Sequence, residues 1–131
     1  MGKRFEKWLA PEVEHGKMTK YNWLVLYPEG LVLGEGSDIG AFTLIQAKYG
    51  VEIGAGVEIG SHCAIYSHSS IDGKMGKVTI GQGAMIGSHS TIMPDISIGK
   101  NAIIGAHSLV LHDIAADTIA FGVPARHVRM R

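Results

Sequence analysis

The stretch VTIGQGAMIGSHSTIMPDISIGKNAIIGAHSLV, residues 78–110, repeats one pattern every six residues. An aliphatic residue opens each unit, a glycine often follows it, and a small or β-branched residue tends to come fifth. A step of six is a multiple of two, so it fits the alternation of a strand and not the 3.6-residue turn of a helix. Glycine can adopt the backbone conformations of a sharp corner. Each unit therefore predicts a short strand that ends at a corner.

The same period extends over most of the chain, with two breaks. Three successive units would close one triangular coil, and stacked coils would pair each strand with the coils above and below. The alternative, an antiparallel sandwich, has no fixed six-residue glycine period. The pattern resembles the hexapeptide repeat of left-handed parallel β-helices, so we expect an all-β solenoid of that kind. The aliphatic positions, in three runs, are Leu33, Ile39 and Ile45; Ile53, Ile59, Ile65 and Ile71; and Ile80, Ile86, Ile92, Ile98, Ile104 and Val110.

The two breaks predict loops. Two extra residues fall around 48–50, and three extra residues fall within 72–77, which contains two glycines and two lysines. Insertions in a repeat array usually lie on one side of the solenoid, often the binding side. We expect the second loop to contact a substrate.

The ends of the chain lack the period. We expect a single domain in which 1–30 form a cap, 31–115 form the coils and 116–131 form a C-terminal tail. In the cap, Phe5, Trp8 and Leu9 have roughly helical spacing, which favours a short helix, and Asn22–Tyr27 (NWLVLY) favours a strand. A cap of this kind covers the open end of a solenoid.

Composition narrows the class of protein. The 131 residues include 12 basic and 12 acidic ones, which gives no sign of a nucleic-acid partner. Cys63 is the single cysteine, so no internal disulfide can form, and its fifth place in a unit predicts packing and not a nucleophile. No apolar run approaches ~20 residues, so we expect no membrane insertion. We interpret the chain as a soluble cytoplasmic protein.

Histidine recurs at the fourth place of three similar units, as His68, His89 and His107. Counting three units per coil, with Ile71 as a coil position, predicts that they form one column with a spacing of about 4.8 Å, and that His62 lies on another face. Stacked imidazolium ions repel one another, which favours the neutral form that a general base requires. His68 directly precedes the second insertion, so we predict it as the base, with His89 second. Corner residues are also often merely exposed.

Residues 78–129, from VTIG to GVPARHVR, resemble the C-terminal half of the hexapeptide-repeat acyltransferases. That family includes galactoside, maltose and serine acetyltransferases and nucleotide-amino-sugar N-acetyltransferases. The resemblance implies acetyl-coenzyme A as the acyl donor, no metal, and a homotrimer whose cofactor groove lies between subunits. It also implies direct attack of the acceptor on the thioester, with a histidine as base and without a covalent enzyme intermediate.

The resemblance also assigns cofactor-binding positions. Ser88 and Ala106 match residues that touch the pantetheine arm, and His112 stands where many relatives have lysine. Arg126 and Arg129 match the pair that meets the phosphate end of the cofactor. Two guanidinium groups suit that role, because arginine presents a planar set of donors to phosphate.

The resemblance implies an acetyltransferase that acts on a sugar. We expect the acceptor to be the amino group of a nucleotide-linked amino sugar in surface polysaccharide synthesis, with a sugar hydroxyl as the alternative. A zinc enzyme of the γ-type carbonic anhydrase kind is the alternative of another class, because His107 and His112 lie five residues apart, as two ligands do in those enzymes. A non-catalytic scaffold is a third.

Overall fold

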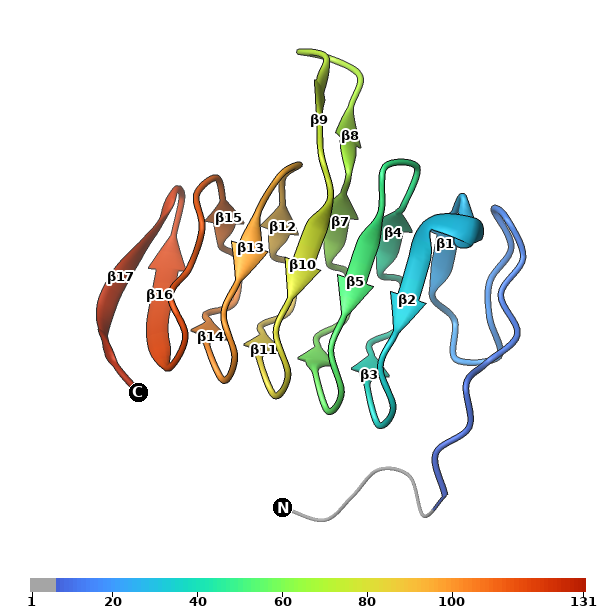
Figure 1. The fold of residues 1–131 in the computed structure, drawn as a ribbon, viewed down its shortest axis with the longest axis horizontal. Helices are drawn as coiled ribbons and strands as arrows, with labels where there is room; N and C mark the ends of the chain where they lie inside the picture. Colours follow the sequence, from blue (N-terminus) through green and yellow to red (C-terminus); the bar gives the residue numbers. More distant parts are fainter. Residues whose placement is uncertain (1–6) are drawn as a thin grey trace.

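The computed structural model describes residues 7–131, and in it the chain winds into a left-handed parallel β-helix, as the six-residue period predicts (Figure 1). Three sheets, parallel except for the last strand of the chain, form the sides of a prism. The first sheet contains β1 (Leu24–Leu26), β4 (Leu44–Gln46), β7 (Ala64–Tyr66), β12 (Thr91–Ile92) and β15 (Leu109–Val110). The second contains β2 (Leu31–Leu33), β5 (Val51–Ile53), β10 (Val78–Ile80) and β13 (Ser97–Ile98). The third contains β3 (Asp38–Ile39), β6 (Glu58–Ile59), β11 (Met85–Ile86), β14 (Ile103–Ile104), β16 (Thr118–Gly122) and β17 (Ala125–Met130).

The core is a set of aliphatic columns inside the prism. In the first sheet Ile65 pairs with Ile45 on one side and with Ile92 on the other, and all three side chains are fully buried. The fifth residue of most units also points inward, and the hydroxyls of Thr43, Ser90 and Ser108 bond to nearby carbonyls, whereas the buried Ser37 Oγ has no hydrogen-bond partner within residues 7–131. Thr43 Oγ1 donates to Gly60 O at 2.9 Å, and Ser108 Oγ donates to Gly105 O at 2.7 Å. Buried polar groups that are paired in this way carry little penalty.

The coils turn at three corners. The first corner joins the first sheet to the second, and it includes the 3-10 turn Pro28–Gly30. The second corner joins the second sheet to the third, and the third corner joins the third sheet back to the first. Left-handed residues with positive φ mark the second corner at Gly36, Gly56, Gly83, Asn101 and Asp117, and the third corner at Asn22, Phe42, His62, His89 and His107.

Both breaks in the period fall at the first corner, as expected for insertions in a repeat array. The second break is a hairpin of β8 (His68–Ser69) and β9 (Lys74–Met75), which projects from the prism (Figure 1). Ile71 lies in the turn between these strands and is 98% exposed. The prediction that Ile71 is a coil position is therefore wrong, and the next inward isoleucine after Ile65 is Ile80.

The N-terminal part of the described chain contains the predicted strand but not the predicted helix. The predicted strand is confirmed as β1, but from Trp8 onward no α-helix forms before it among the described residues, and Phe5 lies outside them. Pro11 disfavours a helix at this point, because proline lacks the backbone donor and restricts the residue before it. Trp8 Nε1 instead donates to Ser37 O at 2.9 Å.

The C-terminal tail extends the third sheet. β16 pairs in parallel with β14, and β17 returns antiparallel to β16. Among residues 7–131 there is no helix with the length and apolarity needed to cross a bilayer.

Candidate functional site

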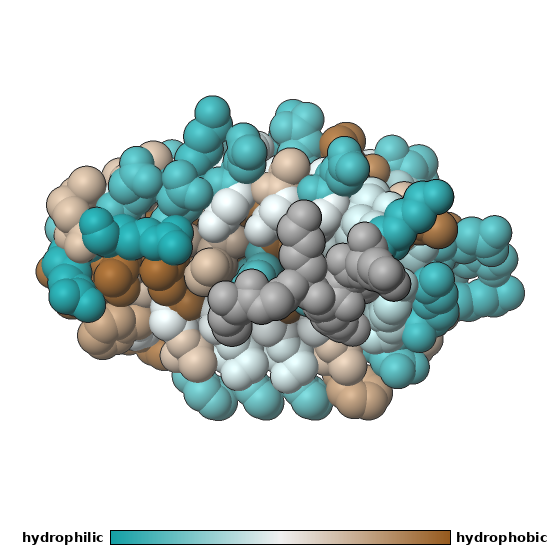
Figure 2. Space-filling view, turned by 90° about the horizontal axis from the view of Figure 1, so that it is seen from below, coloured by the Kyte–Doolittle hydropathy of each residue, from teal (hydrophilic) through white to brown (hydrophobic). Residues whose placement is uncertain are grey.

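A shallow groove of about 410 Å³ runs along the outer face of the third sheet. Its walls are outward side chains that become apolar along the sheet, from Asp38 and Glu58 to Met85 and Ile103. The view from below shows hydrophobic side chains gathered toward the end where the C-terminal strands lie (Figure 2). An extended ligand with an apolar arm fits this shape better than a compact one.

A row of glycines forms the floor of the groove, at Gly40, Gly60, Gly87 and Gly105. These glycines are required by packing between coils. A Cβ on Gly87 would lie 2.4 Å from the backbone nitrogen of Ala106, and a Cβ on Gly60 would lie 2.6 Å from that of Ser88. The same close packing leaves a floor without side chains, over which a ligand could approach the backbone.

The structure brings four of the five predicted cofactor residues to this side of the prism. Ala106 lines the groove, and Ser88 follows Gly87 of its floor. Arg126 and Arg129 lie exposed on β17, at the end of the same sheet. His112 is separate from them, because it lies after β15 at the first corner.

The histidine column differs from the prediction. His62 stacks on His89 with ring centroids 4.8 Å apart and an angle of 3° between the planes, and His89 stacks on His107 at 4.8 Å and 11°. Phe42 continues the column at 5.2 Å from His62. His68 is not a member, so two expectations are wrong: that His68 shares a face with His89, and that His62 lies elsewhere.

The register explains this difference. Ile86 pairs with Ile59 and Ile104 in the third sheet, so the histidines three residues after them share the third corner. Ile65 belongs to the first sheet, which places His68 at the first corner. Counting Ile71 as a coil position shifted the predicted order by one face. His89 consequently lies at a corner next to the third sheet of its own chain, whereas His68 lies at the corner opposite that sheet.

His68 opens the hairpin and is partly buried. The ring of Tyr49 packs against its imidazole edge to face, with centroids 5.4 Å apart and an angle of 76°. Tyr49 comes from the loop with two extra residues, one coil away. Sequence reasoning missed it, although the break at 48–50 was a usable signal.

Cys63 is not a nucleophile in this arrangement. Its side chain is buried in the core, and its Sγ lies 3.3 Å from Gly87 O, to which the thiol donates. Burial raises the pKa of the Cys63 thiol and so disfavours the reactive thiolate.

No cluster of three or more histidine, cysteine, aspartate or glutamate side chains that could hold a metal ion occurs within residues 7–131. His107 and His112, the pair that suggested a zinc site, lie at different corners, before and after β15.

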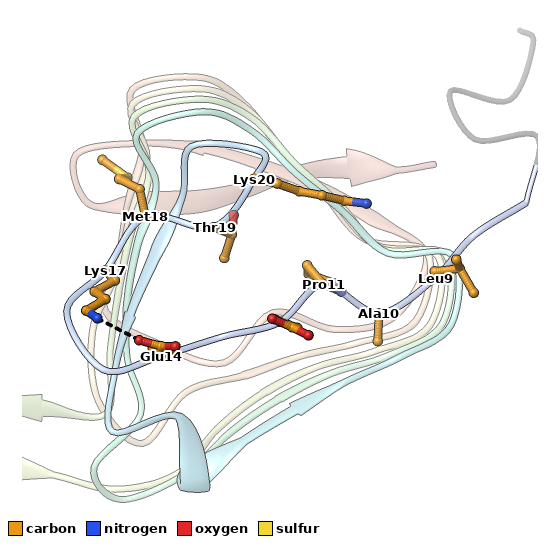
Figure 3. Close-up of a pocket in the computed structure, with 9 residues that line it drawn as sticks. Leu9, Ala10, Pro11, Glu14, Lys17, Met18, Thr19 and Lys20 are labelled. Carbon is orange, nitrogen blue, oxygen red and sulfur yellow. Dashed lines mark ion pairs between the residues drawn. The ribbon is translucent and has the colours of Figure 1, made fainter.

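A second cavity, of about 540 Å³, lies at the N-terminal end of the solenoid. Figure 3 shows that it is enclosed by the irregular segment before β1, with the ion pair Lys17–Glu14 at 2.9 Å on one side. It is lined by segments 9–12, 14 and 17–20, none of which contains a histidine or a cysteine. It therefore contains none of the histidines predicted as the base, and we do not assign the active site to it.

Comparison with protein families and solved structures finds similarity to hexapeptide-repeat transferases. Residues 77–112 match the family model described as bacterial transferase hexapeptide (six repeats). A maltose O-acetyltransferase from Clostridium difficile 630 superposes with a TM-score of 0.77 at 30% identity, over 83% of this chain and 63% of that one. The chain thus spans less than two thirds of that enzyme. A comparison with curated proteins found no match.

Two further solved structures share the architecture. The serine acetyltransferase of Neisseria gonorrhoeae matches with a TM-score of 0.71 at 27% identity, over 82% of this chain and 41% of that one. AntD, an N-acyltransferase from Bacillus cereus solved with dTDP and 3-hydroxybutyryl-CoA, matches with a TM-score of 0.69 at 22% identity, over 87% of this chain and 79% of that one. At this last identity the likeness shows the fold alone.

Proposed function

We propose that this chain, a hexapeptide-repeat protein with the left-handed β-helix fold of known acetyltransferases, transfers an acetyl group from acetyl-coenzyme A to a sugar. The groove on the third sheet is the observation that carries the proposal. It has a floor of glycine backbone, an apolar stretch and two arginines at the end of its sheet. Starting from the arginines, these features would meet the phosphates of acetyl-coenzyme A first and its pantetheine arm next, with the thioester farther along the groove.

The residues of the groove fit the parts of that ligand. Arg126 and Arg129 would hold its phosphate groups, because guanidinium groups bind phosphate with paired, charge-assisted hydrogen bonds. Ser88 and Ala106 would border the pantetheine arm, where small residues leave room for an extended chain. His112 lies away from this track, so its part in binding depends on a neighbouring subunit.

The proposed reaction uses a neutral histidine. The imidazole of His68 accepts the proton of the acceptor amine or hydroxyl as the nitrogen or oxygen attacks the thioester carbonyl. The bond between that carbon and sulfur then breaks, and the coenzyme A thiolate leaves and takes up a proton. Backbone N–H groups would stabilise the intermediate oxyanion. His89, at the third corner beside the sheet that carries the groove, is the second candidate for the base.

The position of His68 supports an active site shared between copies. The third sheet lies opposite the first corner of the prism, so one chain does not place His68 over its own groove (Figure 1). A homotrimer in which the first corner of one copy meets the groove of the next would bring them together. The half-buried outward leucines of the first sheet, Leu24, Leu44 and Leu109, supply an apolar face for such an interface.

For the acceptor we propose the amino group of a nucleotide-linked amino sugar used in surface polysaccharide synthesis. A sugar hydroxyl is the second candidate. The similarity to the maltose O-acetyltransferase favours it, since that enzyme has the highest identity of the three structures compared.

Thiol release from acetyl-coenzyme A tests the proposal. We expect acetyl transfer with at least one member of a panel of nucleotide-linked amino sugars and free sugars. His68→Ala should lower kcat by about 10²-fold or more, the usual contribution of a general base. His89→Asn, which retains a residue suited to the left-handed corner, serves as the comparison. A full rate in His68→Ala together with a large loss in His89→Asn would transfer the role of base to His89.

A further inference from the structure

We propose that Tyr27, Lys48, Tyr49 and His68 form the acceptor subsite, and that this subsite binds an acceptor bearing a phosphate ester, such as a nucleoside diphosphate-linked sugar. The inference rests on the proposed function and names the residues that would bind the phosphate-bearing part of its second substrate. It is independent of the groove, because all four residues belong to the first corner.

The two breaks in the repeat meet in space at this corner. Gln46 pairs with Tyr66 across β4 and β7, so the loop after β4 lies beside the hairpin after β7. Leu26 pairs with Gln46 on the other side, which places the turn at Tyr27 next to the same loop. Three successive coils therefore each contribute to one surface at the base of the hairpin.

Ring contacts join the side chains of that surface. Lys48 Nζ lies 5.6 Å from the ring centroid of Tyr27 and 5.7 Å from that of Tyr49. Tyr49 in turn packs edge to face against His68. The order of groups is thus an aromatic ring, a cation, a second aromatic ring and the proposed base.

Hydrogen bonds fix the loop that carries Lys48 and Tyr49. Ser67 is fully buried, and its hydroxyl lies 2.8 Å from both the backbone oxygen and the Oε1 of Gln46. The same hydroxyl accepts the backbone N–H of Tyr49 at 3.0 Å. Bonds to a buried hydroxyl from the neighbouring coil make this a preformed site, which reduces the entropy lost when a ligand binds.

The chemistry of the cluster points to a phosphate ester. Lys48 is exposed, and within residues 7–131 the ion pairs are Lys17–Glu14 and Lys77–Glu52, so its charge is available. Lysine binds phosphate as a point charge, and tyrosine rings offer flat faces to a base or a sugar. A phosphate at Lys48 would place the attached sugar beside Tyr49. Because the ring of Tyr49 contacts His68, the sugar would then lie near the proposed base.

Binding of uridine diphosphate to the full chain, measured by calorimetry without acetyl-coenzyme A, tests the subsite alone. We expect saturable binding that weakens by about tenfold or more in Lys48→Met, because a charge-assisted contact is lost. Lys48→Arg should recover part of it. Lys100→Met, an exposed lysine near the second corner, is the matched control and should bind like wild type. No binding to wild type, or equal affinity in Lys48→Met, would overturn the subsite.

Kinetics then separate this inference from the proposed function. With a nucleotide-linked amino sugar, Lys48→Met should raise KM for the acceptor about tenfold or more and leave kcat and KM for acetyl-coenzyme A nearly unchanged. Acetyl transfer with an unchanged acceptor KM in Lys48→Met would refute the subsite and retain the function. Loss of nucleotide binding in Lys48→Met, without acetyl transfer by wild type to any acceptor, would retain the subsite and refute the function.

Discussion

At the scale of single residues, Ile65 and Ile71 show how the same spacing can give opposite environments. They stand six residues apart in the sequence pattern, yet Ile65 is fully buried in the first sheet and Ile71 is 98% exposed in the hairpin turn. The aliphatic side chain alone does not decide between them. The residues after Ile71 are Asp72 and Gly73, and Asp-Gly is a strong hairpin signal because both residues tolerate the backbone of a tight turn.

Alanine substitutions at these two positions measure the difference. Ile65→Ala should lower the free energy of unfolding by about 2–5 kcal/mol, because it leaves a cavity in a column that cannot collapse. Ile71→Ala should change it by less than about 0.5 kcal/mol, as expected for an exposed side chain. Urea titration followed by circular dichroism gives both values. Similar losses in the two variants would contradict the assignment of Ile71 to the hairpin.

At the scale of elements, the repeat predicted strands and corners well but not their order around the prism. The six-residue period, the glycine that often follows the aliphatic residue and the inward positions are local properties of the sequence. The coils, the buried isoleucines and β1 could therefore be predicted from it. The sheet to which a unit belongs depends on counting across each insertion. Because Ile71 was counted as a unit, His68 was predicted at the same corner as His89, and His62 was predicted outside the column. In the structure His68 lies at the first corner and His62 belongs to the column.

The glycine floor of the groove gives a prediction at the same scale. Gly87→Ala should lower the free energy of unfolding by about 3 kcal/mol, because its Cβ would lie 2.4 Å from the backbone nitrogen of Ala106 and force two coils apart. Gly56→Ala, at φ +67 with nothing within 4 Å of the added carbon, should cost about 1 kcal/mol from backbone strain alone. Chemical denaturation of both variants provides the comparison, and equal losses would argue against close packing of coils at the groove.

At the scale of the whole molecule, the prism separates the groups to which the proposed reaction assigns a role. The groove and its arginines lie on the third sheet, and His68 and its neighbours lie at the opposite corner. The sequence could indicate both sets of residues, since each has a local signal. It could not show that they face away from each other in one chain, because that depends on how the coils close. A site assembled from two copies resolves the separation without any change of fold.

Mixing two inactive variants tests this assembly. We expect His68→Ala and the double variant Arg126→Ala, Arg129→Ala each to be nearly inactive, since one lacks the base and the other the phosphate contacts. In randomly mixed trimers, about a quarter of sites formed between two copies would combine an intact His68 with an intact arginine pair. Coexpression of differently tagged chains and purification of the trimers that carry both tags remove the homotrimers. One site in three is then intact in each trimer, so thiol release should recover about a third of the wild-type rate. Mixed oligomers as inactive as either parent would place the base and the arginine pair of each site on the same chain, and the shared site would have to be abandoned.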